Sequence, residues 1–356
     1  MAIQNLIDLN DISNAELQEI IALAGEIKKN PRNYMHACDG MLMATLFYEP
    51  STRTQMSFQS AMLRLGGQVI GFDNPQNASV AKGETVADTV RVVSGYTDLI
   101  VMRTPVEGAP LAATLFSRVP VINAGDGGHL HPTQTLTDLT TLIYEKGRLD
   151  HLTIGMCGDM KNGRTVHSLL RALAPLEGNH FIFISTEELQ LPQYAIDFLD
   201  EHHCSYEFAS DLESVMPKLD VLYMTRIQKE RFASREQYEA QKGVFVLDAE
   251  KMKKGKADLL VLHPLPRVDE ITTEVDADER AGYFKQTEYG MYARMALILT
   301  ILKKSQKRDS IQLPTPDRSH CTNECCITNH EPTLLQLTYQ KEGKTVCAFC
   351  DSPIEL

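Results

Sequence analysis

A chain of 356 residues exceeds the size of a typical single hydrophobic core, so two domains with room for a small extra module are expected. Its hydrophobic content of 43% is that of an ordinary globular protein, and its net charge of −12 argues against nucleic acid as a partner, because such binding depends on basic patches. No run of 18 or more apolar residues and no basic secretory opening are found, so we expect no membrane partner and a cytoplasmic location.

Strand-like and helix-like segments alternate along the chain. An opening helix is predicted from about Asp11 to Ile21, where capping residues precede apolar residues at helical spacing. This alternation predicts an α/β fold of two domains with mostly parallel sheets flanked by helices. Strands are predicted near residues 42–47, 68–72, 98–102, 119–122, 152–156, 180–184, 220–224, 244–247 and 259–262.

Two helices are expected to connect these domains. A helix beginning near His131 is expected to cross from the first domain to the second, and a helix at residues 287–304 is expected to return. The first domain is therefore placed at residues 1–132, completed by the returning helix, and the second at residues 133–286. The polar, proline-containing segment 305–320 is predicted to be a linker.

The segment after the first predicted strand has the composition of an anion-binding helix start. Four polar residues follow Pro50, namely Ser51, Thr52, Arg53 and Thr54. Ser51 or Thr52 would lie at or beside the N-cap, where unpaired N–H groups and the positive end of the helix dipole attract a phosphate. The hydroxyls and the Arg53 guanidinium add donors suited to a tetrahedral dianion. For these residues alone, an ordinary capped helix with an exposed arginine is the alternative.

Four other polar segments follow predicted strands, at residues 123–138, 155–168, 224–231 and 263–267. With the 51–54 segment, five strand ends thus carry polar side chains. In an open parallel sheet, ligands bind at the carboxyl ends of the strands, so these segments are predicted to converge in one crevice.

Six short motifs, taken in order, resemble those of aspartate carbamoyltransferase catalytic chains, and the resemblance runs over about residues 1–305. Ornithine carbamoyltransferases share the phosphate motif but typically carry a Cys where this chain has Pro264, and Arg226 with Gln228 suits a second carboxylate. The motifs are Ser-Thr-Arg-Thr (51–54), Val-Met-Arg-Thr-Pro (101–105), His-Pro-Thr-Gln (131–134), Gly-Arg-Thr-Val-His-Ser (163–168), Thr-Arg-Ile-Gln (225–228) and His-Pro-Leu-Pro-Arg (263–267).

The resemblance implies transfer of the carbamoyl group of carbamoyl phosphate to the amine of L-aspartate, giving N-carbamoyl-L-aspartate and phosphate, in de novo pyrimidine biosynthesis. It implies no catalytic metal and no organic cofactor. The residues that it places at carbamoyl phosphate are Ser51, Thr52, Arg53, Thr54, Arg103, His131, Gln134, Pro264 and Leu265, the last two through backbone carbonyls. Those that it places at aspartate are Ser79, Lys82, Arg164, Arg226 and Gln228, and those that it makes catalytic are Arg53, Thr54, Lys82, Arg103, His131 and Gln134.

The small polar segment 76–85 is either an ordinary surface loop with a solvated lysine or a loop with a role in catalysis. By resemblance, Ser79 and Lys82 belong to a loop that inserts into the active site of a neighbouring chain, which implies a homo-oligomer built on a catalytic trimer with shared sites. Family members with two consecutive lysines use the second, whereas here only Lys82 precedes Gly83.

Several polar residues near these motifs have structural roles as their alternative. His131 and His263, taken singly, are more often structural than catalytic, and Asp159 or His167 could simply order the loop around Arg164. The bond between Leu265 and Pro266 resembles one that is cis in the family, although trans is the default for such a bond.

Five of the eight cysteines fall within the last 36 residues. Cys321, Cys325 and Cys326 form one knuckle and Cys347 with Cys350 forms another, separated by a predicted hairpin with an arm at 334–339 and a turn at 341–344. Four thiolates from two knuckles fit tetrahedral zinc. Scattered reduced thiols are the alternative, and disulfides are disfavoured in an intracellular chain.

The tail at residues 321–356 resembles the zinc module of the separate regulatory chain of some aspartate carbamoyltransferases. The resemblance selects Cys321, Cys326, Cys347 and Cys350 as ligands of a structural Zn²⁺ and leaves Cys325 spare. The preceding segment has no room for the regulatory chain's nucleotide-binding domain. We expect the tail to dock and help hold catalytic chains together.

The sequence leaves two other functions as alternatives. A zinc ribbon that binds nucleic acid would need a basic face, but the tail carries two lysines and five carboxylates, a net charge of −3. A non-catalytic partner protein with the same fold is disfavoured, because every polar segment retains its functional groups. An assay of carbamoyl aspartate formation separates these possibilities from an enzyme.

Overall fold

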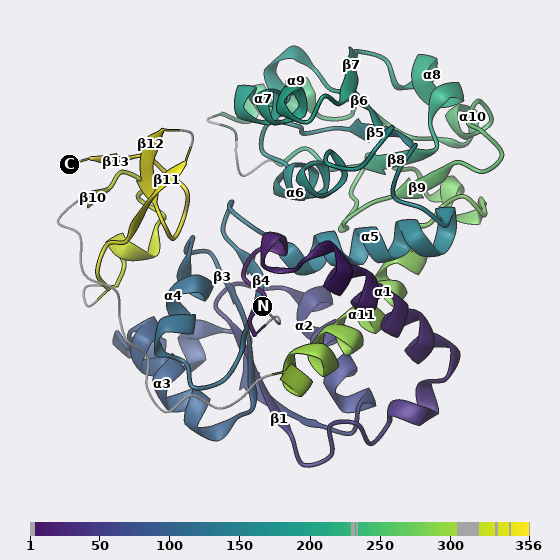
Figure 1. Ribbon diagram of the computed structural model, residues 1–356. Coiled ribbons are helices and arrows are strands. Elements are labelled where there is room, and N and C mark those ends of the chain that lie inside the picture. The colour runs from purple at the N-terminus through teal and green to yellow at the C-terminus, as the bar shows by residue number, and fades with distance from the viewer. Residues whose placement is uncertain are drawn as a thin grey trace. The chain divides into compact units, whose positions relative to one another are not determined.

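The structure is a computed structural model, and it describes residues 4–228, 232, 234–304, 320–331, 334–341 and 343–355. The chain divides into two compact units, one of Met1–Thr133 with Met291–Leu356 and one of Gln134–Gly290. Each unit is built on its own parallel sheet (Figure 1). All but the last residue of the predicted linker 305–320 lies outside the described residues. In the described part of the chain, no helix is long and apolar enough to span a bilayer.

The first unit contains a four-stranded sheet in the order β2-β1-β3-β4, with every pair parallel. Strands β1, β3 and β4 are almost completely buried, whereas β2 is half exposed at the edge. Continuous burial is typical of a parallel strand covered on both faces by helices. The four strands are β1 (Leu42–Phe47), β2 (Gln68–Phe72), β3 (Leu99–Thr104) and β4 (Val121–Asp126), close to the predicted ranges.

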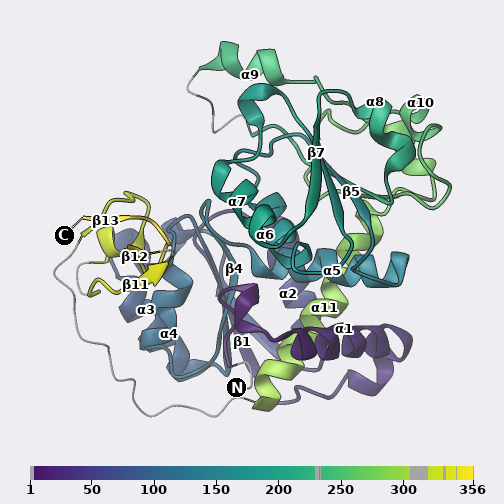
Figure 2. The same ribbon diagram turned by 45° about the horizontal axis from the view of Figure 1, so that its top comes forward.

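The predicted opening helix is α1 (Asn14–Lys29). Its N-cap Ser13 accepts from the Glu16 backbone N–H while the Glu16 carboxylate accepts from Ser13, a reciprocal capping box. The returning helix is α11 (Tyr283–Lys304), which begins four residues before the predicted start and lies beside α1 (Figure 2). Other helices of this unit are α2 (Thr52–Arg64), α3 (Val86–Tyr96), α4 (Ala109–Phe116) and the 3₁₀ helices η1 (Leu9–Asp11), η2 (Pro31–Tyr34), η3 (Pro75–Asn77) and η4 (Ser79–Lys82).

The second unit contains a five-stranded parallel sheet in the order β7-β6-β5-β8-β9. The prediction of a strand at 244–247 was wrong, because only Leu247 forms an isolated bridge, to Ile271. One strand, β7, was not predicted, since its edge position leaves it half exposed and polar. The strands are β5 (Thr153–Cys157), β6 (His180–Ile184), β7 (Ser205–Ala209), β8 (Val221–Met224) and β9 (Leu260–Leu262).

Helix α5 (Pro132–Lys146) begins next to His131, as predicted, and contains the division between the two units. The other described helices of the second unit are short, and all but the last lie between successive strands of the parallel sheet, whereas η8 follows β9. They are α6 (Arg164–Leu173), α7 (Gln193–Glu201), α8 (Leu212–Val215), α9 (Arg235–Gln241), α10 (Ala249–Met252), η5 (Glu187–Leu189), η6 (Met216–Lys218) and η8 (Thr273–Ala277).

The cysteine-rich tail forms two small antiparallel pairs and η9 (Ile327–Asn329). One pair joins β10 (His320–Cys321) to β13 (Ile354–Glu355), and the other joins β11 (Thr338–Lys341) to β12 (Lys344–Cys347). The predicted hairpin is present, although its first strand starts later than the predicted arm. The tail lies beside α3 and α4 (Figures 1 and 2), and its Ile327, Leu334 and Phe349 belong to the same apolar core as residues of those helices.

Candidate functional site

The predicted anion-binding segment lies at the carboxyl end of β1, where the chain turns into α2. Ser51 is the N-cap of α2, but its side chain makes no capping hydrogen bond. The N–H groups of the first turn are therefore not satisfied by the cap, which differs from an ordinary capped helix. Thr54 is buried in the first turn, and Arg53 is exposed. This arrangement leaves donors available for a phosphate.

Two arginines define the charge of this end of the sheet. Arg103, on β3, is mostly buried, and its Nε lies 2.8 Å from Glu49 Oε1. Burial lowers the pKa of Arg103 even though the Glu49 carboxylate acts in the opposite direction. Burial and the nearby Arg103 charge both lower the pKa of Arg53. Because two close guanidinium groups disfavour each other's charge, an anion placed beside them would be stabilised.

His131 is brought to Arg103 by the start of α5. Its Nε2 lies 3.3 Å from Arg103 Nη1, and the ring is 6% exposed. Since a guanidinium can only donate, His131 Nε2 accepts this hydrogen bond. Gly125, in the segment before His131, has a φ of 121°, a backbone conformation that favours glycine. The structure therefore places together two of the residues that were predicted to hold the carbamoyl oxygen.

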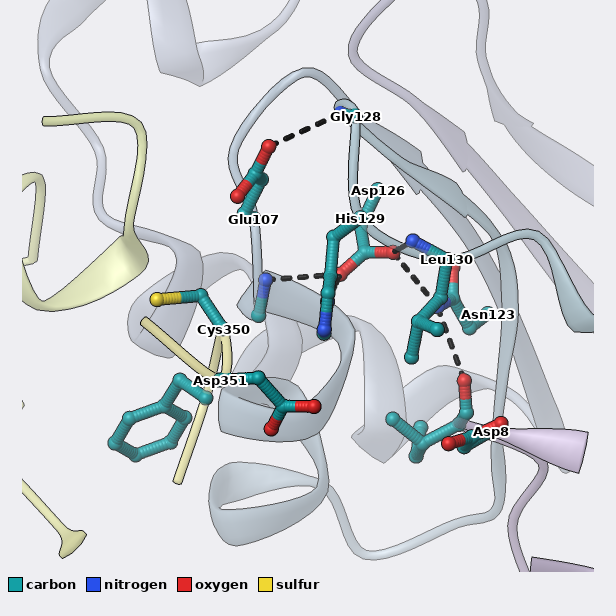
Figure 3. Close-up of polar contacts among 12 residues, drawn as sticks. Asp8, Glu107, Asn123, Asp126, Gly128, His129, Leu130, Cys350 and Asp351 are labelled. Atoms are coloured by element: carbon teal, nitrogen blue, oxygen red, sulfur yellow. Dashed lines mark hydrogen bonds and ion pairs between the residues drawn. The ribbon is translucent and has the colours of Figure 1, made fainter. Parts of the chain in front are cut away.

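A buried carboxylate, Asp126, organises the loop that follows β4 (Figure 3). Its Oδ1 accepts from Asn123 Nδ2 at 3.1 Å and from the Leu130 backbone N–H at 3.0 Å. Its Oδ2 accepts from the Gly108 backbone N–H at 2.9 Å and is 3.1 Å from His129 Nδ1. His129 is thus engaged within the loop. Burial lowers its pKa, but the contact with Asp126 and the charges of Asp351 and Glu107 together outweigh burial, so the pKa is raised.

Ser79 and Lys82 lie at the two ends of the short helix η4, in the first unit, and both are exposed. Gly83 ends this turn in the left-handed region, with φ of 90°. Within this chain, Ser79 and Lys82 therefore lie on the surface. An ordinary surface loop and a loop that inserts into a neighbouring chain both predict this position.

In the second unit, the predicted aspartate residues follow the neighbouring strands β5 and β8. Arg164 is the first residue of α6, and Arg226 and Gln228 follow β8. Gln228 Nε2 donates to the Asn162 backbone carbonyl at 2.9 Å, which ties the segment after β8 to the loop before α6. The side chains of Arg164, Arg226 and Gln228 are all half-buried, so part of each remains accessible to a ligand.

The loop before α6 is held by its own residues. A Cβ on Gly158 would lie 2.3 Å from the Thr225 carbonyl oxygen, so this close approach requires glycine. Asp159 Oδ1 accepts from the Asn162 backbone N–H at 2.9 Å, and His167 Nε2 lies 2.7 Å from the Met160 carbonyl oxygen. Asp159 and His167 thus order the loop around Arg164. This is the structural role that the sequence offered as the alternative to a direct role in the site.

Gln134, on α5, is oriented by a fully buried carboxylate one helical turn later. Asp138 Oδ1 accepts from Gln134 Nε2 at 2.8 Å and from Gln286 Nε2 at 2.6 Å, while the Tyr223 hydroxyl donates to Oδ2 at 3.0 Å. Burial and the Asp138 charge raise the pKa of Tyr223 well above its ordinary value, so the hydroxyl remains a donor. Because a carboxylate only accepts, the Gln134 oxygen must face the other way.

His263 supports the loop that carries Pro264 and Leu265. Its Nδ1 accepts from the Leu265 backbone N–H at 2.7 Å, so the proton lies on Nε2, which is 2.7 Å from Glu270 Oε1. His263 is buried and serves this loop rather than a ligand. The bond between Leu265 and Pro266 is cis, as the resemblance implied.

The four cysteines predicted to bind a metal are gathered in the tail, and all are buried. Their sulfur atoms lie within 4.8 Å of one another, with Cys321 and Cys350 3.5 Å apart and Cys326 and Cys347 3.6 Å apart. These separations exceed a disulfide bond of about 2.05 Å. They fit a tetrahedron around a metal with bonds of about 2.3 Å. Cys325, the one left spare, is exposed.

The thiols of this cluster are electrostatically linked. Burial raises the pKa of Cys321 to about 12, whereas hydrogen bonds from Cys326 and Cys350 lower the pKa of Cys347. Gln336 Nε2 also donates to Cys347 Sγ, at 3.2 Å. The Cys347 thiolate is thus favoured while the Cys321 thiol resists ionisation, and a divalent cation would favour the ionised form of both.

Sequence reasoning missed two supporting residues, Glu49 and Asp138. Asp138 lies four residues after Gln134 in a predicted helix, and that spacing could have indicated the contact. Glu49 reaches Arg103 across two parallel strands, and no local signal in the sequence indicates that pairing.

Comparison with known proteins gives a family for most of the chain. Residues 4–144 match the aspartate/ornithine carbamoyltransferase, carbamoyl-P binding domain, and residues 150–301 match the Asp/Orn binding domain of the same family. The aspartate carbamoyltransferase catalytic subunit of Lachnoclostridium phytofermentans is 57% identical over 300 residues, which is 84% of this chain and 98% of that protein. That of Clostridium botulinum (strain Langeland) is 56% identical over the same shares.

Solved structures agree with this assignment. The catalytic subunit of M. jannaschii aspartate transcarbamoylase has a TM-score of 0.80 and 44% identity, over 85% of this chain and 98% of that one. Aspartate transcarbamoylase from Trypanosoma cruzi, solved with carbamoyl phosphate and aspartate, has a TM-score of 0.78 and 38% identity, over 84% and 95%. The cysteine-rich tail lies beyond both matched domains. The chain belongs to the aspartate/ornithine carbamoyltransferase family.

Proposed function

We propose that the chain is an aspartate carbamoyltransferase, which transfers the carbamoyl group of carbamoyl phosphate to L-aspartate. The observation that carries this proposal is its 57% identity over 98% of a curated catalytic subunit. Arg103 and His131 lie together in the first unit, and the Arg226–Gln228 segment is tied to the loop before Arg164 in the second. The product, N-carbamoyl-L-aspartate, would enter de novo pyrimidine biosynthesis in the cytoplasm.

Carbamoyl phosphate would be bound chiefly by the first unit. Its phosphate would accept hydrogen bonds from the start of α2 and from two guanidinium groups, and its carbamoyl oxygen would accept from Thr54, Arg103 and His131. Gln134 presents its amide oxygen, which suits the carbamoyl NH₂ group, and the carbonyls of Pro264 and Leu265 would accept from the same group. The phosphate ligands in this assignment are Ser51, Thr52, Arg53, Thr54 and Arg103.

L-Aspartate would be bound by Arg164, Arg226 and Gln228, with Ser79 and Lys82 from a neighbouring chain. Arginine offers a planar pair of donors to a carboxylate, whereas lysine is a point charge, so the two arginines suit the two aspartate carboxylates. The pair of carboxylate-binding arginines and Pro264 favour aspartate over ornithine as the acceptor.

The chemistry requires no covalent enzyme intermediate. The aspartate amine attacks the carbamoyl carbon, negative charge develops on the carbamoyl oxygen, and donors at that oxygen stabilise it. The C–O bond to phosphate then breaks, and the departing phosphate takes the amine proton. Catalysis would thus come from proximity and from charge stabilisation by Arg53, Thr54, Arg103 and His131.

We also propose a function for each domain predicted from the sequence. Residues 1–132, completed by 287–304, would bind carbamoyl phosphate, and residues 133–286 would bind aspartate. Residues 305–320 would be a linker to the tail. By resemblance, the exposed Ser79 and Lys82 would complete the site of an adjacent chain in a catalytic trimer.

The tail at 321–356 would hold Zn²⁺ through Cys321, Cys326, Cys347 and Cys350, as a structural module resembling that of the regulatory chain. The separations of 3.5 Å and 3.6 Å between paired sulfur atoms support this geometry. Zinc would neutralise the buried thiolates and organise a segment that is too short for a large core of its own.

The deciding test is a direct assay of the purified chain with carbamoyl phosphate and either L-aspartate or L-ornithine. Formation of N-carbamoyl-L-aspartate and phosphate in equal amounts, with no citrulline, is expected. Turnover of ornithine in preference to aspartate, or no turnover by a folded protein, would refute the assignment.

A further inference from the structure

The cysteine-rich tail is hydrogen-bonded to the turn at residues 105–108, between β3 and α4 of the same unit, and also to the start of α3, where the Ala87 N–H donates to Glu331 Oε2. The Glu107 backbone N–H donates to the Cys325 carbonyl at 2.9 Å, and the Ile327 N–H donates to the Glu107 carbonyl at 2.9 Å. The two hydrogen bonds flank Cys326, one of the four clustered cysteines. The position of this turn is therefore tied to the knuckle that carries Cys326.

The Glu107 side chain extends this link in a second direction. Its Oε2 accepts from Asn323 Nδ2 in the tail at 2.7 Å. Its Oε1 accepts from the Gly128 backbone N–H at 3.1 Å, a contact drawn in Figure 3. The Asn323 oxygen is itself engaged by the Cys325 N–H at 2.9 Å, which leaves its amide nitrogen for Glu107. One carboxylate therefore bridges the tail and the loop after β4.

That loop leads to the carbamoyl-phosphate residues. Gly127 N–H donates to the Thr104 carbonyl at 2.8 Å, and Asp126 holds both Gly108 and Leu130. The next residue after Leu130 is His131, whose Nε2 contacts Arg103. Hydrogen bonds thus link the knuckle that carries Cys326 through the 105–108 turn to Leu130, and the chain continues directly to His131, which contacts Arg103; these are the two side chains that we assign to the carbamoyl oxygen.

Packing reinforces the same turn. A Cβ on Gly108 would lie 2.5 Å from the Phe349 carbonyl oxygen and 2.6 Å from its Cβ, so the tail backbone fits closely only against a glycine. Phe349 lies between Cys347 and Cys350 and is buried. Both knuckles of the cluster therefore contact the turn, one through hydrogen bonds and the other through packing.

We propose that Glu107 is a positioning residue that couples the cysteine module to carbamoyl-phosphate binding within the same chain. An intact module holds the 105–108 turn, the turn holds the loop after β4, and the loop sets His131 against Arg103. This inference rests on the proposed function. It gives the tail a role in the binding of carbamoyl phosphate, in addition to any role in assembly.

The matched pair of variants is Glu107→Gln and Glu324→Gln. Glutamine keeps the size of the side chain but has only one acceptor oxygen, so it cannot serve both the Asn323 and Gly128 donors. Glu324 is exposed in the same module, and its backbone carbonyl, not its carboxylate, bonds to His330. We expect Glu107→Gln to weaken carbamoyl-phosphate binding about tenfold, as for the loss of one hydrogen bond to a charged group, and Glu324→Gln to leave it unchanged.

The readouts are calorimetric binding of carbamoyl phosphate, KM for each substrate, metal content, and hydrogen exchange of peptides covering residues 126–131. Faster exchange in that loop and a raised KM for carbamoyl phosphate, with KM for aspartate within about twofold, support the coupling. Parent-like binding and exchange in Glu107→Gln would overturn it. A parent that binds no carbamoyl phosphate would instead overturn the proposed function on which it rests.

A second experiment removes the metal with a mercurial. In the full-length parent, metal removal should weaken carbamoyl-phosphate binding about as much as Glu107→Gln does, and in the variant it should add little, because the same link is already broken. Equal further loss in both proteins would overturn a path through Glu107. If Glu107→Gln fails to fold, Asn323→Asp keeps an oxygen for the Cys325 N–H but replaces the donor to Glu107 with an acceptor. It should show the same faster loop exchange, and an unchanged loop would reject the proposal.

Discussion

Gln134 and Asp138 lie one turn apart on α5, and Gln134 Nε2 donates to Asp138 Oδ1 at 2.8 Å. The carboxylate thereby fixes which face of the Gln134 amide is an acceptor. Tyr223 bonds to the other carboxylate oxygen, so a matched pair of variants can separate the orientation of Gln134 from the general integrity of the buried network.

Asp138→Asn should lower kcat/KM by about 10- to 100-fold, the effect of about 1–3 kcal/mol. The amide has one acceptor oxygen in place of two, so its NH₂ group must face either the Tyr223 hydroxyl or the Gln134 and Gln286 donors, and a neutral oxygen accepts more weakly than a carboxylate. Tyr223→Phe should lower the melting temperature but leave Gln134 oriented, with activity within a few fold of the parent. Steady-state kinetics and thermal unfolding of both variants test this. Equal losses of activity in the two variants would show that Asp138 acts only through stability.

Arg53→Ala should nearly abolish turnover while the fold is retained. The loss of a charge-assisted contact in the transition state is expected to cost about 3 kcal/mol or more, which is about 150-fold or more in kcat. Arg64→Ala, at the exposed end of the same helix, is the control and should behave like the parent. A folded Arg53→Ala protein within tenfold of the parental rate would remove Arg53 from the site.

Mixing inactive Lys82→Ala chains with inactive Arg53→Ala chains should restore part of the activity. If Lys82 completes the site of a neighbour, some sites in a hybrid trimer contain neither lesion. The measurement is activity after subunit exchange, with hybrid formation verified by native mass spectrometry. Hybrids that form and remain inactive would mean that Lys82 acts within its own chain.

Cys347→Ser should release the metal and unfold the tail, because a structural metal site and its local fold form together. The control is Cys325→Ser, which alters the exposed cysteine outside the cluster. Elemental analysis should find about one zinc per chain in the parent and in the control, and none in Cys347→Ser. A parent without zinc would contradict the metal assignment, and an unchanged mass in solution after verified zinc loss would contradict a role in assembly.

Glu270 should make stability depend on pH in the acidic range. Burial raises its pKa, but hydrogen bonds from His263 and the backbone outweigh burial, so the native pKa lies below the ordinary value. Its stabilising contribution is therefore complete above the unfolded pKa of about 4.3 and is lost as pH falls through the lower native pKa. Glu270→Gln should flatten the acid limb of a stability–pH curve, whereas exposed Glu274→Gln should not. Parallel curves for parent and Glu270→Gln would contradict this.

The sequence alone determined the local features of the molecule. Apolar runs fixed β1, β6 and most other strands, and the capping residues fixed the start of α1, because these signals act within a few residues. Half-exposed β7 escaped detection, and the 244–247 run was predicted as a strand although only Leu247 found a bridging partner. An apolar run becomes a strand only where a neighbouring strand offers its hydrogen bonds.

Some features of the site could likewise be predicted from the sequence, whereas others depend on the tertiary structure. The Ser-Thr-Arg-Thr helix start and the clustered cysteines could be read from the sequence, and the resemblance already set Cys326 apart from Cys325. The fold agrees with that choice, since Cys326 is buried and Cys325 is exposed. The pairing of Glu49 with Arg103 and the bridge from Glu107 to Gly128 were decided by tertiary structure. Parallel strands bring distant segments to one sheet edge, and the helices and loops between them leave no local trace of which partners will meet.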